Sequence, residues 1–219
     1  MKSFRLYYAC LALAVLVAGT ALLGACASRT ILVEVPPKMD LGRFKTIGII
    51  EFDAGQDVGL GVQATRRFIE SVQSAQPGTL ILELGRMNSL LKTVGRTKLD
   101  AEAIKAIARK KGCDAVFTGN LTVSDVKTEV SLRSLSPRGV SAKAKVDGAL
   151  RVKLYHTASG ALAWSDSAKG EWTLARARLM HVHINDPDET YDDMINDLVY
   201  ATTRDLRPTR ERRPIKEEK

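Results

Sequence analysis

Hydrophobic residues change their spacing at Cys113, and this change divides the chain into two kinds of structure. Between Lys45 and Lys111, short apolar runs alternate with segments in which apolar residues recur every three or four positions. That pattern predicts buried strands joined by helices. After Cys113, apolar and polar residues alternate, which predicts antiparallel strands with one covered face. The expected class is α/β, a mixed sheet with an antiparallel three-stranded C-terminal portion and helices packed on it in a two- or three-layer sandwich.

The order of elements follows from turn and capping residues. Asp100 and Gly112 mark the start and end of one helix, and Asp186 with Pro187 starts another that ends near Arg207. Strands are expected at residues 45–53, 79–84, 115–132, 140–155 and 161–179. The helix between Asp100 and Gly112 covers residues 101–111, and two other helices are expected at residues 62–76 and 87–94.

The domain organisation follows from these elements and from the segments on either side of them. A single α/β domain is expected over residues 43–206. Residues 26–42, which contain two consecutive prolines, predict an extended spacer. Residues 207–219 carry six basic and three acidic residues and no apolar period, so they predict a disordered basic tail.

The N-terminus has the pattern of a bacterial lipoprotein signal peptide. Two basic residues precede a long apolar run, which ends in the sequence Leu23-Gly24-Ala25-Cys26. Cleavage is expected between Ala25 and Cys26, which removes residues 1–25. The sulfur of Cys26 is then expected to carry lipid, and two or more acyl chains hold a protein stably on a membrane. An uncleaved transmembrane anchor is the alternative, although the apolar run is at or below the roughly 20 residues that span a bilayer.

Charge and cysteine content limit the classes of function. Removal of Lys2 and Arg5 with the signal peptide lowers the formal net charge from +8 to +6, so the folded part is only mildly basic. No nucleic-acid partner is expected from such a balance. Cys10 leaves with the signal peptide and Cys26 is acylated, so Cys113 has no partner for a disulfide. We expect Cys113 to be a buried, unreactive side chain.

Four segments carry a resemblance to a known family: Lys45–Phe52, Lys111–Leu121, Ala149–Tyr155 and Ser159–Ser165. They resemble the curli-secretion lipoprotein superfamily, which includes periplasmic activators of penicillin-binding proteins and relatives of the TolB amino-terminal domain. The resemblance implies a non-catalytic lipoprotein that contacts another envelope protein or forms a homo-oligomer. Ala27 follows the expected lipid-bearing cysteine. Lipoproteins retained at the inner membrane have an aspartate at this position, so the chain resembles an outer-membrane lipoprotein. The expected location is the outer membrane, lipid-anchored and facing the periplasm.

A subunit of an outer-membrane secretion channel is an alternative that the same family suggests. The curli-type channel inserts long hairpins into the membrane, and Val123–Val146 alternates apolar and polar residues on both arms. Aromatic residues are absent at both ends of this hairpin, whereas membrane-inserted strands usually place them at the interfaces. A hairpin whose apolar face is covered by helices is therefore favoured, and insertion stays open.

The run Gly59-Leu60-Gly61 resembles a dinucleotide-binding fingerprint. It opens a helix after a strand, and Glu83 follows about 20 residues later, as in that motif. The run begins six residues after Asp53, however, whereas the fingerprint needs a tight turn directly after the strand. We interpret the glycines as a flexible loop that lets the helix start close to the sheet. No cofactor is expected.

An envelope hydrolase or a metal-binding protein is the alternative from another class. His181 and His183 would share one strand face and could bind a metal together with an aspartate, Asp186 or Asp188. The acidic residues near Asp186 fit the start of a helix better than a calcium loop. Two further pairs are candidates for glycan chemistry: the carboxylates of Asp166 and Glu171, and the rings of Trp164 and Trp172, which are expected to pack in the core. No catalytic, cofactor-binding or metal-ligating residue is assigned.

Overall fold

The computed structural model describes residues 30–132, 140–178 and 181–214. The chain divides into two compact units, a larger one of residues Pro36–Pro208 and a smaller one that contains the two ends of the described chain. Within the described ranges, no helix has the length and apolar content that a membrane-spanning helix needs.

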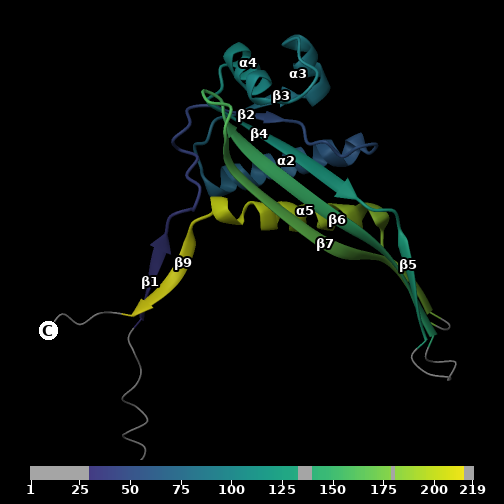
Figure 1. The fold of residues 1–219 in the computed structure, drawn as a ribbon. Helices are drawn as coiled ribbons and strands as arrows, with labels where there is room; N and C mark the ends of the chain where they lie inside the picture. The colour runs from purple at the N-terminus through teal and green to yellow at the C-terminus, as the bar shows by residue number, and fades with distance from the viewer. Residues whose placement is uncertain (1–29, 133–139, 179–180, 215–219) are drawn as a thin grey trace, which may run out of the picture. The chain divides into compact units, whose positions relative to one another are not determined.

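The larger unit is built on one mixed sheet (Figure 1). Its strands follow the order β3-β2-β4-β6-β7-β8, and β5 lies beside β6. Strand β2 is parallel to β3 and to β4, whereas the other pairs are antiparallel. The strands are β2 (Ile47–Ile50), β3 (Ile81–Gly85), β4 (Ala115–Val123), β5 (Lys127–Leu132), β6 (Val140–His156), β7 (Leu162–Arg178) and β8 (His181–Ile184). The predicted α/β class with a mixed sheet is confirmed.

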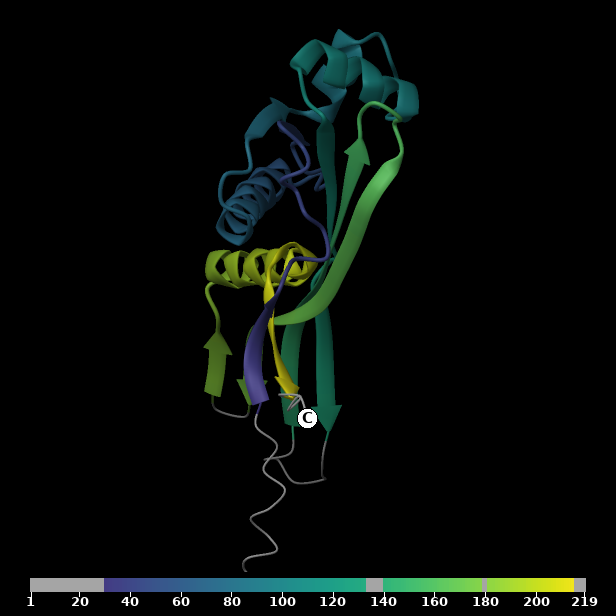
Figure 2. The ribbon, with the colours of Figure 1, turned by 90° about the vertical axis from the view of Figure 1, so that its left-hand side faces the viewer.

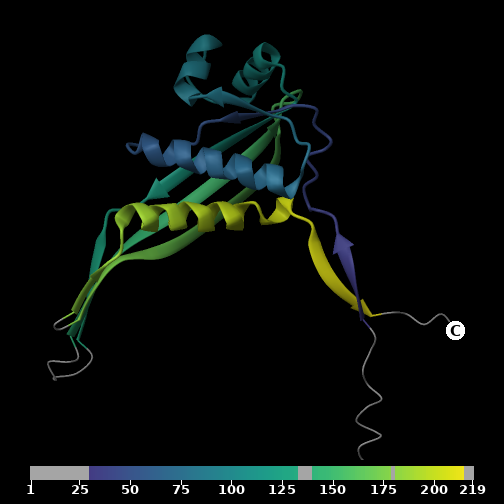
Figure 3. The ribbon, with the colours of Figure 1, turned by 180° about the vertical axis from the view of Figure 1, so that it is seen from behind.

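Helices α2 (Val58–Ala75) and α5 (Pro187–Thr202) lie side by side across one face of this sheet (Figure 3). They bury Phe68 of α2 and Met194 of α5 in the main core, together with Phe117 of β4. Helices α3 (Met87–Thr93) and α4 (Ala101–Lys111) pack on β3 and β4. Their contacts form a second core on the opposite face, with the members Ile50, Leu84, Leu90, Ile107, Cys113 and Val116. A short 3-10 turn, Arg204–Leu206, follows α5.

Capping residues fix the start of α4 and α5 and the end of α4 as the sequence predicts, whereas α5 ends at Thr202 and not near Arg207. At α4, a side-chain oxygen of Asp100 accepts a hydrogen bond of 2.7 Å from the backbone N–H of Ala103. The helix ends at Gly112, whose φ of 72° lies in the left-handed region. At α5, Asp186 accepts from the N–H of Asp188 at 3.0 Å, and Pro187 occupies the first turn.

Helix α2 starts earlier than the sequence indicates. It begins at Val58, so Gly59 and Gly61 lie in its first turn, and the interpretation of a flexible glycine loop is wrong. The close approach to the sheet is present, because a Cβ atom at Gly61 would lie 2.4 Å from the carbonyl oxygen of Phe52. The hydroxyl of Thr65 accepts from the N–H of Phe52 and donates to the carbonyl of Gly61, both at 2.8 Å. A glycine is therefore required where the helix crosses the end of β2.

The segment predicted as one strand over residues 115–132 is two strands, β4 and β5. Both lie against the same edge of β6, β4 along residues 148–156 and β5 along residues 140–145. At the break, Ser124 donates its backbone N–H to the carbonyl of Asp147 at 2.9 Å, and its hydroxyl accepts from the N–H of Asp147 at 3.0 Å. The side chain of Ser124 thus replaces one backbone partner, and residues 124–126 leave the ladder.

The smaller unit is a two-stranded antiparallel sheet. Strand β1 (Thr30–Val35) pairs along its length with β9 (Thr209–Pro214). The sequence predicts an extended spacer at β1 and a disordered tail at β9, so the structure differs at β9, which is a paired strand. The ladder satisfies the backbone groups of both strands and sets Glu34 opposite Arg210.

Candidate functional site

The two faces of the sheet in the larger unit are covered to different extents. Helices α2 and α5 cover one face, whereas among the described residues of this unit no helix lies over β6 and β7 on the other (Figure 2). We call this second surface the open face. It contains outward side chains of three neighbouring strands: Thr118, Asn120 and Thr122 of β4; Lys145, Asp147, Ala149, Arg151, Lys153 and Tyr155 of β6; and Ser165, Ser167, Lys169 and Glu171 of β7.

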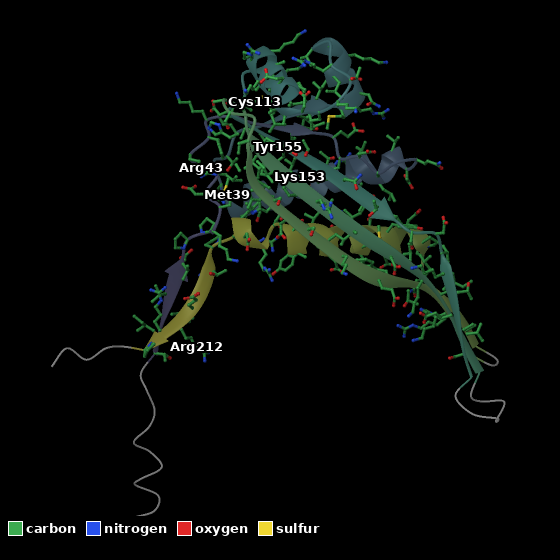
Figure 4. The ribbon with its side chains drawn as sticks, viewed as in Figure 1. Met39, Arg43, Cys113, Lys153, Tyr155 and Arg212 are labelled. Atoms are coloured by element: carbon green, nitrogen blue, oxygen red, sulfur yellow. The ribbon has the colours of Figure 1, made fainter. Side chains whose placement is uncertain are left out.

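Alternation along β6 explains why these side chains point outward. Leu150, Val152 and Leu154 are buried against the helices, so the residues between them, Arg151 and Lys153, project from the opposite face. Figure 4 labels Lys153 and Tyr155 on this strand. The open face is therefore a consequence of the same apolar pattern that builds the core.

Ion pairs balance the charges at the end of the open face near β5. The ammonium group of Lys145 lies 2.8 Å from a carboxylate oxygen of Glu129 and 2.8 Å from one of Glu171. Lys127 forms an ion pair with Asp147. Hydrogen bonds to these carboxylates raise the pKa of Lys145 and of Lys127 above the ordinary lysine value. We call these five residues the paired band.

Three cations lie beyond the paired band, toward the other end of the open face. Within the described ranges, Arg151, Lys153 and Lys169 form no ion pair and no side-chain hydrogen bond. Glu171, the acidic residue nearest to Lys169 along β7 on this face, is already bound to Lys145. We call these three residues the cationic patch. It stands among short polar side chains, since Asn120 and Ser167 lie opposite Arg151 on the two neighbouring strands.

The geometry of the sheet sets the spacing within the cationic patch. Arg151 and Lys153 are two residues apart on β6, so their Cα atoms are about 7 Å apart. Lys169 is opposite Ala149 and hence diagonal to Arg151, with a Cα separation of about 7–8 Å. Like charges on neighbouring positions repel one another, and a bound anion would relieve that repulsion.

A hollow of about 400 Å³ lies where the parallel strands β2 and β3 end. In α/β sheets, the carboxyl ends of strands next to a change in strand order commonly bind ligands. Here the charged groups are already paired, because Glu51 and Arg86 form an ion pair with an N–O distance of 3.2 Å. A side-chain oxygen of Asp53 accepts from the N–H of Gly55 at 3.0 Å. The hollow therefore offers few free groups to a ligand.

Among the described side chains, the histidines and acidic residues that could share a metal are not brought together. His183 is exposed on β8, and the side chain of His181 lies outside the part of the chain described. His156 is at the far end of β6, with its ring centroid 6.0 Å from that of Phe44. In the described ranges, no group of three or more histidine, cysteine, aspartate or glutamate side chains could hold a metal ion. Asp186 and Asp188 are used in the start of α5.

The two carboxylates that are candidates for glycan chemistry do not converge. Asp166 lies opposite Val152, a core residue, whereas Glu171 is on the open face and binds Lys145. The tryptophans pack against the main core as predicted. Trp164 meets Phe117 edge to face with ring centroids 6.1 Å apart, and the indole N–H of Trp172 donates to Asp197 at 3.1 Å.

Cys113 is buried, as the sequence predicts. Its side chain belongs to the core beneath α3 and α4 and is 5% exposed. Burial raises the pKa of the thiol, and the neighbouring Asp114 adds to this effect. A protonated, covered thiol is a poor nucleophile. The expected lipidation site, Cys26, and the cleavage position after Ala25 lie outside the described residues.

The cationic patch is a feature that the sequence prediction missed. Basic residues at alternate positions of β6, Arg151 and Lys153, were a usable signal, because the apolar residues between them already indicated the buried face. Lys169 could not be placed beside them from the sequence, because its position depends on the register between β6 and β7.

No protein-family model matches the chain, and no curated protein sequence matches it either. Solved structures with a similar fold include a PelC dodecamer from Paraburkholderia phytofirmans, with 12% identity, a TM-score of 0.41, and coverage of 82% of this chain and 98% of that one. The lipoprotein GNA1162 from Neisseria meningitidis is 16% identical, with a TM-score of 0.33 and coverage of 66% and 89%. The LpoB C-terminal domain from Salmonella enterica is 11% identical, with a TM-score of 0.35 and coverage of 69% and 90%. At TM-scores below 0.5, these likenesses do not assign the chain to a family, and the resemblance to the curli-secretion lipoprotein superfamily stays a prediction.

Proposed function

We propose that this chain is a lipid-anchored, non-catalytic accessory protein of the bacterial cell envelope. It sits on the outer membrane, faces the periplasm, and holds another envelope component against its α/β unit. The observation that carries the proposal is the signal sequence ending in Leu23-Gly24-Ala25-Cys26, because acylation of Cys26 would fix the protein at a membrane. Ala27 supports sorting to the outer membrane.

The arrangement of side chains supports a binding role rather than catalysis. An acid–base or nucleophilic mechanism needs reactive groups within hydrogen-bond reach of one another. The candidate groups of this chain are separated or already engaged: Asp166 and Glu171 point to opposite faces, and Cys113 is buried beneath helices. The open face, in contrast, is a polar surface on which Arg151, Lys153 and Lys169 form no ion pair within the described chain. A surface of this kind suits recognition.

Replacement of the acylated cysteine tests the anchor. In Cys26→Ser, no thioether can form, so we expect the protein to accumulate as an uncleaved precursor or to leave the outer-membrane fraction. Density-gradient fractionation of the native host and the intact mass of the mature protein measure the two outcomes. Cys10→Ser is the matched control, because Cys10 leaves with the signal peptide and its loss should not alter fractionation.

An unmodified amino terminus in the wild-type protein, or outer-membrane retention of Cys26→Ser equal to wild type, would contradict the proposal. Recovery of the wild-type protein in the inner-membrane fraction would contradict the location alone. Crosslinking in whole cells, followed by identification of the attached component, identifies the partner. Light scattering on the full chain in non-ionic detergent measures whether copies associate.

A further inference from the structure

We infer that the cationic patch of the open face, Arg151, Lys153 and Lys169, binds an acidic polysaccharide, that is, a chain of sugars bearing carboxylate groups. This inference deepens the proposed function, on which it rests for the presence of such a polymer next to the protein. The capacity to bind depends on the surface alone, through its charge pattern and the side chains that surround the charges.

The charge pattern indicates an anionic occupant. On the same face, Lys145 and Lys127 each have carboxylate partners, so the fold itself neutralises these two cations. The cationic patch lacks such partners within the described residues although it belongs to the same sheet. Its three cations stand on backbone positions about 7–8 Å apart along and across two strands, which suits a ligand with several anionic groups along its length rather than a single small ion.

The neighbouring side chains indicate a hydroxyl-rich occupant. Two of the cations are flanked across the strands by short polar residues, Lys153 by Thr118 and Ser165, and Arg151 by Asn120 and Ser167. Their hydroxyl and amide groups can both donate and accept hydrogen bonds, as sugar hydroxyls require. Tyr155, half-buried at the end of the row, adds an aromatic ring with a polar tip.

Other occupants fit this surface less well. Stable protein interfaces have an apolar centre with large anchoring side chains surrounded by a polar rim. Here most positions around the cations carry short side chains, Thr118, Asn120, Thr122, Ala149, Ser165 and Ser167. The large side chains of Tyr155 and Leu162 lie opposite each other at one end of the row rather than at its centre. An anionic lipid surface needs only positive charge, so it gives no role to the hydroxyl and amide side chains between the cations.

The test uses the full chain as purified from its host in non-ionic detergent, whether or not Cys26 is acylated, and measures binding to alginate, a polyuronate, by biolayer interferometry at about 50 mM salt. The test variant is Arg151→Gln, Lys153→Gln and Lys169→Gln combined. Loss of three exposed charge contacts should weaken binding about tenfold or more. The matched control removes the same number of charges from the region of α3 and α4, with Lys92→Gln, Lys98→Gln and Lys111→Gln, and should change the affinity about twofold or less. Unfolding curves of both variants show whether the fold is intact.

Further measurements complete the test. Wild-type binding should fall steeply as salt is raised, because ions screen exposed charges, and neutral dextran should not bind. The inference is overturned if the patch variant binds alginate as tightly as wild type, or if both variants lose binding equally. It is also overturned if the patch variant loses binding only to phosphatidylglycerol vesicles, or loses only self-association in light scattering. Because the assay does not depend on the anchor, its failure is distinguishable from failure of the Cys26→Ser experiment.

Discussion

The two ends of the sheet in the larger unit differ in how they are covered. At β2 and β3, helices lie on both faces, and neighbouring residues such as Ile49 and Ile50 are buried on opposite sides. At β6 and β7, only one face is covered, and Leu150 is buried while Arg151 is exposed. One continuous sheet is therefore packed on both faces at its parallel end, whereas its antiparallel end has one face that no described helix covers.

The largest loss of stability is expected for a substitution in the core on the covered side of the sheet. Phe117 is fully buried between Phe68 and Trp164, so Phe117→Ala should leave a cavity and lower the free energy of unfolding by about 3–5 kcal/mol. Lys153→Ala on the open face should change it by about 0.5 kcal/mol or less. Urea unfolding monitored by tryptophan fluorescence measures both. Equal losses would mean that the open face is packed in solution.

Two adjacent residues of β6, one on each face of the sheet, test whether the two faces are packed differently. A Cβ atom at Gly148 would lie 2.6 Å from the sulfur of Met194, which is buried under α5. Gly148→Val should therefore destabilise the fold by about 1–3 kcal/mol through overpacking. Ala149→Val, one residue further and on the open face, should cost about 0.5 kcal/mol or less. Thermal unfolding of the two variants is the measurement, and a larger loss at position 149 would reverse the assignment of faces.

A smaller effect is expected at the helix that covers β6 and β7. The carboxylate of Asp186 accepts from the backbone N–H of Asp188 at the start of α5. Asp186→Ala should lower the free energy of unfolding by about 1 kcal/mol, whereas Asp186→Asn keeps a capping oxygen and should lose much less. Chemical unfolding measures the difference. Identical losses in both variants would show that the negative charge, rather than the hydrogen bond, stabilises the helix.

The smallest expected effect concerns the paired band on the open face. Hydrogen bonds to Glu129 and Glu171 raise the pKa of Lys145 in the folded state. A raised pKa contributes stability that is fully present below the pKa of the unfolded chain and is lost as the pH rises through the folded value. The urea midpoint of wild type should therefore fall more than that of Lys145→Gln between pH 10 and pH 12, about the range in which lysines titrate. Parallel pH profiles would contradict this coupling.

Local features of the fold were predictable, and long-range ones were not. Helix α4 could be placed between Asp100 and Gly112, because its capping residues act within a few positions of the chain. The break after β4 depends on Ser124 bonding to Asp147 from another strand, and this contact is not encoded in the spacing of apolar residues. The start of α2 had a local signal in Asp57, whose side chain accepts from the N–H of Leu60 at 3.2 Å, whereas the need for glycine at position 61 depends on Phe52.

The candidate site was predictable only in part. Alternation on β6 already assigned Arg151 and Lys153 to the face opposite the core. The lack of acidic partners could not be foreseen, because it depends on Glu171 being opposite Asp147 and within reach of Lys145. Pairing between β1 and β9 was missed for the same reason, since the two strands come from opposite ends of the sequence.

The pairing of β6 determines the order in which the sheet can assemble. Strands β6 and β7 are joined by a tight turn in which the N–H of Gly160 donates to the carbonyl of His156 at 2.8 Å, so this hairpin requires little loop closure. Near β2, Thr46 bonds to Asp114 across 68 residues of chain, a far slower encounter. Strand β2 comes first among the strands of this sheet along the chain, and its partners β3 and β4 follow 34 and 68 residues later, at Ile81 and Ala115 opposite Ile47. Ile47, Ile49 and Ile50 therefore stay exposed until these long-range contacts form.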